Sequence, residues 1–356
     1  MSGAEEVLSE TASKLLESLC DRMTIDSVEA GHWPGPAWQR LVSDGWLRIA
    51  VPESEGGAGL GWPEAIGFAR LAGYHNAPLP IVEAVLALGL AAEMGCDDFE
   101  ELTSFAPGLG PDLPELAHNG KRTLNGVLHR VPWGRHADRI AALARDGGAV
   151  RLVVADRKKA EVRQSQNLAG EPRDTLTFQN VPTAFVSEPL AQPQRPPAFL
   201  ALARASQMAG ALQRVMELTV AYANDRKQFG RPIGKFQAIQ QQLAVLAEQA
   251  SAADSAVRAA ILSLGTDRAV SHCAAAKIRA GEAASAAAAI AHGVHAAIGF
   301  TREHALQLST RRLWSWRDEA GNEAYWANQL GREVCALSGS QLWPWLTGQI
   351  SKTKGG

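Results

Sequence analysis

The chain has 356 residues, of which 46% are hydrophobic, and its 37 acidic and 35 basic side chains leave a formal net charge of -2. This balance provides no general attraction to nucleic acid or to anionic membranes, so neither is expected as an electrostatic partner. The length is sufficient for two or three domains around a large buried core, and a globular fold is therefore predicted.

The four cysteines are far apart and form neither a CxxC motif nor a Cys/His spacing. Neither a disulfide framework nor a metal site is therefore predicted, and a reducing compartment fits best. The N-terminal sequence MSGAEEVLSE is acidic and lacks an apolar core. Because the chain also contains no unbroken run of about 18 apolar residues, we expect a cytoplasmic protein without a membrane span.

Residues 1–100 are predicted to form a helical domain, because apolar side chains recur there at three- and four-residue steps. A glycine-rich loop at residues 56–59 interrupts this pattern, but it lacks the strand-then-helix setting of a dinucleotide fingerprint. The expected helices cover residues 5–20, 36–45 and 62–94, the last of them broken near Pro78 and Pro80.

Residues 101–195 change from a helical to an extended pattern. Short apolar runs in this region are bounded by Gly, Asp, Asn and Pro, which is typical of an antiparallel β domain. The expected strands include residues 123–128, 140–144, 150–156 and 175–178.

Residues 196–356 return to the helical pattern. Apolar residues line one helical face on each side of the turn Gly230–Gly234, in which a proline removes a backbone donor and glycines relax the restriction on φ. A helical hairpin is therefore predicted around this turn. The alanine-rich segment 268–292 predicts a further helix whose small side chains allow close packing in a bundle.

Cationic and amide side chains surround this turn, among them Arg226, Lys227 and Arg231 before the second helix and Gln237 and Gln240 at its start. Guanidinium groups suit phosphate oxygens, and a helix N-terminus adds exposed N–H groups and a positive dipole end. Charged turns are also common as solvated corners. Composition alone leaves both interpretations open.

The order of residues is more specific than their charge. The string Tyr-x3-Arg-x-Gln-Phe-Gly-x-Pro-Ile-x3-Gln-x-Ile-Gln, from Tyr222 to Gln240, resembles the signature of the acyl-CoA dehydrogenase family of flavoproteins. Residues 38–59 are similar to the family's N-terminal helical domain, and residues 295–304 resemble its Gly-Phe-Thr loop. This resemblance covers nearly the whole chain. It implies a mainly α fold with a β domain, in which an N-terminal helical domain precedes a middle β barrel and a C-terminal four-helix bundle.

The resemblance also implies a cofactor and a reaction. The cofactor is FAD, the reaction is α,β-dehydrogenation of an acyl-CoA thioester, and electrons pass to electron-transfer flavoprotein. Without the family, Trp133 is interpreted as a plug at the end of the β domain. By resemblance, the FAD-binding residues are Arg226, Gln228, Phe229, Phe236, Gln237 and Gln240 across a subunit interface, with Ile298 and Gly299 near the dinucleotide and Trp133 beside the flavin ring.

The chain departs from the family pattern in two regions. Residues 105–112 replace a Thr-Glu…Gly-Ser-Asp segment that meets the flavin and the acyl chain. In the loop near residue 295, Gly293 stands where a glutamine is usual and Ala296 where a glycine is usual. A methyl group at residue 296 is expected to obstruct the approach to the dinucleotide.

The catalytic base is also displaced. In the family a carboxylate removes the α proton while the flavin takes a hydride from the β carbon, and the base must be positioned near the α carbon. One family position for this base aligns with Ala320, and the other falls near Leu200, where no carboxylate occurs. Glu319, one residue before Ala320, is therefore the candidate catalytic residue.

Several functions are compatible with this pattern. A short chain without an aligned base resembles the smaller subunit of heteromeric dehydrogenases that act on steroid side chains, in which a longer subunit keeps the base. One alternative is a self-sufficient dehydrogenase that uses Glu319 and forms a homo-oligomer. The others are a non-catalytic helical scaffold that has lost FAD and a flavin monooxygenase of the same fold.

Overall fold

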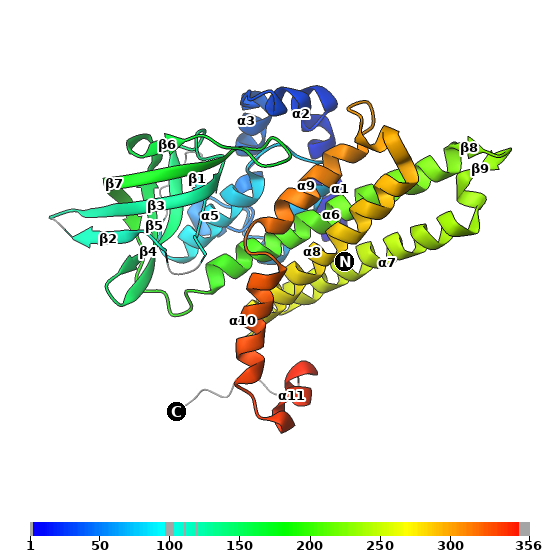
Figure 1. The fold of residues 1–356 in the computed structure, drawn as a ribbon. Coiled ribbons are helices and arrows are strands. Elements are labelled where there is room, and N and C mark those ends of the chain that lie inside the picture. The colour runs from blue at the N-terminus through cyan, green and yellow to red at the C-terminus, as the bar shows by residue number, and fades with distance from the viewer. Residues whose placement is uncertain (1–2, 97–102, 110–111, 119, 349–356) are drawn as a thin grey trace. The chain divides into compact units, whose positions relative to one another are not determined.

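The computed structural model describes residues 3–96, 103–109, 112–118 and 120–348. The chain divides into two compact units, residues 1–200 and 201–356. Figure 1 traces the elements in chain order. The predicted domain boundary at residues 100 and 101 lies outside the described residues, and the three-domain division stays a prediction.

The first unit begins with helices that match the predicted pattern. The break near Pro78 and Pro80 separates two of them, as expected. One helix was not predicted, α2 (Arg22–Glu29), which begins at Asp21, whose carboxylate accepts the Thr24 N–H at 2.7 Å. The others are α1 (Gly3–Leu19), α3 (Gly35–Ser43), α4 (Trp62–Tyr74) and α5 (Ile81–Glu93), with short 3-10 turns at Trp46–Arg48 and Glu53–Glu55.

The β region follows α5 and forms a closed ring. Its pairings run from β4 to β2, β3, β7 and β5 and back to β4, which confirms a barrel. The sheet is not wholly antiparallel as predicted, because β1 and β2 each pair parallel with β4. The strands are β1 (Thr103–Phe105), β2 (Glu115–His118), β3 (Arg122–Pro132), β4 (Arg139–Asp146), β5 (Ala149–Asp156), β6 (Glu161–Arg163) and β7 (Arg173–Val186).

Strand β4 pairs with three other strands of this barrel, β1, β2 and β5. Residues 140–144 are buried, and β4 pairs with β5 from Arg139↔Asp156 to Asp146↔Ala149. The two strands are joined by Gly147 and Gly148, which is a favoured turn for an antiparallel hairpin.

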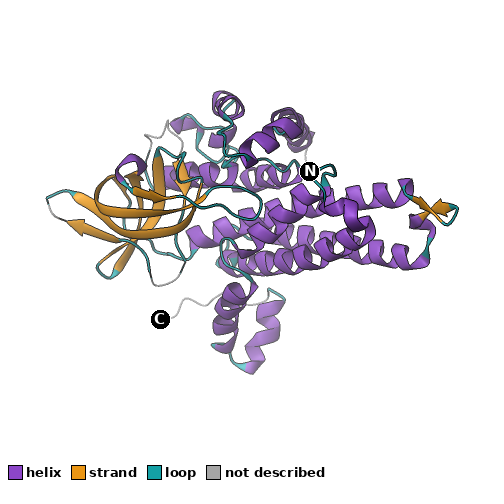
Figure 2. Ribbon diagram, turned by 45° about the horizontal axis from the view of Figure 1, so that its top comes forward, coloured by secondary structure: helices purple, strands orange, loops and turns teal. Residues whose placement is uncertain are grey.

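The second unit contains the predicted helical bundle. Helices α6 (Arg195–Asp225), α7 (Gln237–Leu262), α8 (Ala269–His295) and α9 (Leu306–Asp318) run side by side in Figures 1 and 2. Helices α10 (Glu323–Cys335) and α11 (Gly339–Leu346) follow. Helix α8 packs against α7, α9 and α10, because its many alanines allow close approach from several sides.

Helix α8 and the turn after it, residues 269–300, are long and apolar enough to cross a membrane by length and composition. They contain no unbroken run of about 18 apolar residues. Half of the apolar window is buried inside the protein, and its neighbours are the other bundle helices. The same test is passed by core helices, and the packing of α8 is that of a core helix.

Candidate functional site

The turn between α6 and α7 is a small two-stranded ribbon. Strand β8 (Lys227–Gln228) pairs with β9 (Arg231–Pro232). At its tip Phe229 and Gly230 have φ angles of 52° and 80°. Two positive φ values in succession are typical of a tight hairpin turn, and glycine adopts this conformation without steric cost.

The tip of this ribbon presents unengaged side chains. The ring of Phe229 is 91% exposed, and Phe236 meets only its edge, at 6.1 Å between centroids. Among the described residues, the exposed side chains of Arg226 and Gln228 form no hydrogen bond or ion pair. The ribbon therefore offers cationic and amide donors beside an apolar ring, which suits a ligand or partner that brings acceptors and an apolar face.

The base of the ribbon is fixed to the bundle. Ile233 is buried with Ala223 and Val294, and its N–H donates to Arg226 O at 2.8 Å. The amide of Gln240 donates to Gly234 O at 3.1 Å, so part of its predicted binding capacity is used internally. Gln237 is exposed at the N-terminus of α7, where backbone N–H groups are available.

The loop after α8 lies at the same end of the bundle. A 3-10 turn, η5 (Ala296–Phe300), begins at Ala296, whose φ of 52° and ψ of -141° belong to a region favoured by glycine. Such a backbone costs about 1–3 kcal/mol for a residue with a side chain. The chain thus places an exposed methyl group on a backbone conformation that favours glycine.

The two predicted loop contacts differ in exposure. The side chain of Ile298 is 38% exposed, whereas Gly299 is buried. A Cβ on Gly299 would lie 2.9 Å from His295 Cβ and 3.2 Å from Leu306 Cδ2. Glycine is therefore required at residue 299 for internal packing, and contact with a cofactor stays a prediction for both residues.

The structure brings the signature and the loop together. The ring of Tyr222, the first residue of the signature, stacks on His295 at 4.4 Å with an interplanar angle of 22°. Phe236 and Ile239 pack against the same buried cluster that contains Val294 of α8. The residues from Tyr222 to Gln240 and from His295 to His304 therefore share one end of the bundle, which sequence spacing could not establish.

Trp133 lies in the barrel unit and is engaged by its own chain. Its side chain is 2% exposed. Its ring meets Trp33 edge-on at 5.7 Å, and His136 stacks on Trp33 at 5.1 Å. Burial and the nearby Arg135 lower the pKa of His136. This packing favours the interpretation of Trp133 as a plug, and its predicted role beside the flavin ring stays a prediction.

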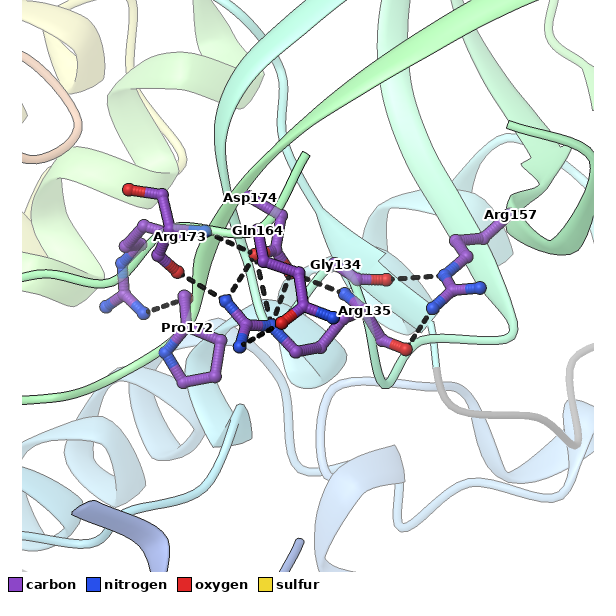
Figure 3. A network of polar contacts seen from close by, with 8 residues as sticks. Gly134, Arg135, Arg157, Gln164, Pro172, Arg173 and Asp174 are labelled. Atoms are coloured by element: carbon purple, nitrogen blue, oxygen red, sulfur yellow. Dashed lines mark hydrogen bonds and ion pairs between the residues drawn. The ribbon is translucent and has the colours of Figure 1, made fainter. Parts of the chain in front are cut away.

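A polar network fixes the turn that carries Trp133 (Figure 3). The Arg135 guanidinium donates to the buried Asp174 carboxylate at 2.6 Å, and Arg135 N–H donates to the other oxygen at 2.6 Å. Arg157 donates to Gly134 O at 2.8 Å and to Arg135 O. Because side-chain and backbone donors converge on Asp174, the turn has little freedom to expose Trp133.

Glu319, the candidate base, follows the end of α9 and is engaged by a cation. Its side chain is 8% exposed, and a carboxylate oxygen lies 2.9 Å from Arg204 Nη2, whose side chain is 3% exposed. Arg204 lies one turn after Leu200 on α6. The segment with the aligned base position and the helix near the alternative position thus meet in a buried ion pair. Glu319 as a base stays a prediction.

The segment around Ala320 is held rigidly. Ala320 and Gly321 have φ angles of 55° and 84°. Trp326 Nε1 donates to Ala320 O at 2.8 Å, and a Cβ on Gly321 would lie 2.6 Å from the same nitrogen. Arg317 Nε donates to Glu323 at 2.7 Å. The position aligned with the base therefore has a fixed backbone but carries only a methyl group.

Lys277 of α8 completes this polar region. The residue is 1% exposed, and its ammonium group donates to Arg317 O at 2.6 Å. Burial lowers the pKa of Lys277 to about 8, although the carboxylates of Glu323 and Glu319 oppose the shift. Sequence reasoning missed Lys277 and Arg204. The available signal was a single charged residue inside each of two apolar helical stretches, AFLALARAS and CAAAKI.

Comparisons with known proteins found a matching family and related chains. Residues 198–335 match the family described as "Acyl-CoA dehydrogenase, C-terminal domain". The acyl-CoA dehydrogenase IpdE2 of Mycolicibacterium smegmatis is 28% identical over 323 residues, which cover 88% of this chain and 93% of that protein.

Solved structures share the whole fold. The ChsE4-ChsE5 complex from Mycobacterium tuberculosis contains a chain with a TM-score of 0.88 and 21% identity, covering 95% of this chain and 99% of that one. The glutaryl-coenzyme A dehydrogenase structure has a TM-score of 0.82 at 19% identity and covers 96% of each chain. At these identities the likeness establishes the arrangement of elements.

Proposed function

The chain belongs to the acyl-CoA dehydrogenase family, and from that premise we propose that it is an FAD-binding subunit of an acyl-CoA dehydrogenase that lacks its own base. A longer companion subunit supplies the glutamate that removes the α proton. The similarity to a chain of the ChsE4-ChsE5 complex, which is named for two chains, supports a heteromeric assembly. The similarity to the Tcur3481-Tcur3483 steroid ACAD supports a steroid-related acyl group.

The observation that carries this proposal is the segment at residues 317–323. Ala320 stands at the aligned position of the base, and the neighbouring Glu319 is paired with Arg204 at 2.9 Å. A general base needs a free lone pair directed at the substrate, within about 2.6–3.2 Å of the proton it takes. A buried carboxylate held by a guanidinium is better suited to fixing the chain than to accepting a substrate proton.

The residues of the ribbon fit FAD. Arg226 and Gln228 are exposed donors without described partners, which suits the phosphate and ribose oxygens of a dinucleotide. The 91% exposed Phe229 ring suits an apolar face of the cofactor or of a partner subunit. When bound, FAD supplies the acceptor for the hydride that leaves the β carbon.

The chain's own contribution is binding and orientation. Arg226 and Gln228 hold the anionic part of the cofactor, and the ribbon's fixed base at Ile233 limits their freedom. Ala320 carries only a methyl group and offers no side-chain proton acceptor. The proton of the substrate is therefore accepted by the companion's site and not by this chain.

Anaerobic flavin bleaching tests the proposal. The chain alone and the chain co-purified with a longer dehydrogenase subunit are mixed with acyl-CoA thioesters, including bulky ones. We expect bleaching with the companion and a rate about 10²- to 10⁴-fold lower for the chain alone, because a positioned base contributes about that factor.

Two variants identify the base if the chain alone is active. Glu319→Gln removes the candidate carboxylate, and Asp318→Asn removes its exposed neighbour as a matched control. Bleaching by the single chain that is lost in Glu319→Gln and kept in Asp318→Asn would make the enzyme self-sufficient. A colourless complex that binds no flavin would favour the scaffold instead.

A further inference from the structure

Three histidines lie together where the loop after α8 meets the bundle. His292 and His295 belong to the last turns of α8, and His304 precedes α9. The rings of His295 and His304 meet at 4.6 Å, and Tyr222 of α6 contacts both, at 4.4 Å and 6.0 Å. This arrangement, the histidine cluster, joins two bundle helices and the segment 296–305.

The third ring is enclosed by aromatic neighbours. His292 stacks between Phe300 of η5 at 4.1 Å and Trp314 of α9 at 5.5 Å. Its side chain is 7% exposed, and that of His295 is 1% exposed. Ring contacts with histidines therefore help to hold the segment 296–305 to the bundle.

The hydrogen bonds together with the buried, unpartnered ring nitrogens favour neutral imidazoles. His295 Nδ1–H donates to Ala291 O at 2.8 Å, which leaves Nε2 buried with a bare lone pair. His292 Nε2–H donates to the Thr310 hydroxyl at 2.9 Å, and its Nδ1 is likewise buried and unpartnered. His304 Nδ1 accepts the Leu306 N–H at 3.1 Å and must be unprotonated to do so.

A proton on any of these rings would lack compensation. Within the described part of the chain, no carboxylate is hydrogen-bonded or ion-paired to the three rings, and the exposed Glu303 and Arg302 flank His304 without contacting it. From α6 the cluster meets Tyr222, and from α9 it meets Thr310 and Trp314. A new N–H at His292 or His295 would be buried without an acceptor, which is costly.

We propose that the histidine cluster is a pH-sensitive latch, which holds the segment 296–305 against α6, α8 and α9 while its rings are neutral and releases the segment when they take up protons. Protonation removes the lone pair with which His304 accepts the Leu306 N–H, and it places a buried N–H without an acceptor on His292 or His295. It also places two positive charges side by side, because His295 and His304 are in ring contact.

The direction of the pH effect follows from the same burial. Burial lowers the pKa of His292, His295 and His304, and for His295 the two neighbouring histidines add to this effect while the bond to Ala291 O opposes it. The unfolded chain therefore binds more protons than the folded chain below about pH 6.5. Stability that is present above that pH is lost as the pH falls.

Urea unfolding of the full chain tests the latch. For each histidine whose folded form excludes the proton, the folding equilibrium constant is expected to fall about tenfold between about pH 7.5 and about pH 5.5. His295→Phe keeps a ring against Tyr222 and removes one titrating group. The fall of its folding equilibrium constant between these two pH values, called the acid loss, should therefore be about tenfold smaller than that of the unmodified chain. Equal acid losses in the two proteins would overturn the proposal.

A second variant covers the case in which His295→Phe does not fold. His304→Asn supplies a neutral side-chain oxygen that can accept the N–H two residues ahead, as the imidazole does. Its acid loss should also be smaller. His129→Asn, at an exposed histidine of β3, is the matched control and should titrate like the unmodified chain.

Limited proteolysis tests release of the segment itself. Trypsin cleavage after the exposed Arg302 should accelerate between about pH 7.5 and about pH 6, relative to cleavage of an unstructured peptide of the same sequence at each pH. The acceleration should be reduced in His304→Asn. An unchanged relative rate would show that the segment stays closed and would overturn the latch.

A flavin-release measurement separates the latch from the proposed function. If Ile298 contacts FAD, which rests on that function, flavin loss from the assembled complex should accelerate in acid and be slower in His304→Asn. Acid opening without flavin loss would confirm the latch and contradict the cofactor role of this loop. If acid causes neither opening of the segment nor loss of flavin, the latch itself is overturned.

Discussion

Two polar regions of the second unit behave in opposite ways. In the ribbon at residues 226–232, cationic and amide side chains are exposed, and Arg226 and Gln228 have no partner among the described residues. In the segment at residues 317–323, Glu319 is paired with Arg204 and Arg317 with Glu323. Exposed polar groups can remain unpaired because water solvates them, whereas buried charges require a partner inside the protein.

The contrast is sharpest at Arg204, for which the largest effect is expected. Arg204→Ala leaves the Glu319 carboxylate buried without its guanidinium, which typically destabilises a protein by about 3–5 kcal/mol. Urea unfolding at neutral pH measures the change. Arg214→Ala, in a partly exposed ion pair with Glu217, is the control and should cost less than about 1 kcal/mol. Equal losses would mean that the Arg204 pair is no more important than a surface pair.

Substitution of Gly321, in the segment at residues 317–323, is expected to have the next largest effect on the free energy of unfolding. Gly321→Ala places a Cβ 2.6 Å from Trp326 Nε1 at a residue whose φ is 84°, so both contact and backbone oppose it. We expect a loss of about 2–3 kcal/mol in unfolding free energy. Gly331→Ala, inside α10 with no heavy atom near the added Cβ, should be neutral or stabilising. Similar unfolding midpoints for the two variants would contradict a fixed segment.

Substitutions in the ribbon are expected to weaken flavin binding without lowering the stability of the chain. Arg226→Ala removes an exposed charged donor, and flavin affinity in the assembled complex should fall by about 1.5–3 kcal/mol. Lys227→Ala, at the next position and outside the family signature, should change affinity less. Flavin titration measures both, and thermal unfolding of the chain alone should be unchanged in either. Unaltered flavin occupancy in Arg226→Ala would remove this residue from the site.

Local features of the sequence were sufficient for the order and type of most elements. The proline break before α5, the strand at residues 149–156 and the hairpin around Gly230 follow from turn chemistry and apolar periodicity, which act over a few residues. Helix α2 was missed because it has only 8 residues, about two turns, over which apolar residues can recur only once. The parallel pairing of β1 with β4 was missed because pairing direction depends on chain crossover, which local pattern does not encode.

The family signature from Tyr222 to Gln240 was also readable from the chain alone, because it is a matter of residue order. Whether a side chain is free to act was decided only by tertiary structure. Glu319 meets Arg204, and Trp133 meets Trp33, across long stretches of sequence. The histidine cluster likewise forms only when α6, α8 and α9 are packed. Burial and pairing depend on these distant neighbours, and no local pattern specifies them.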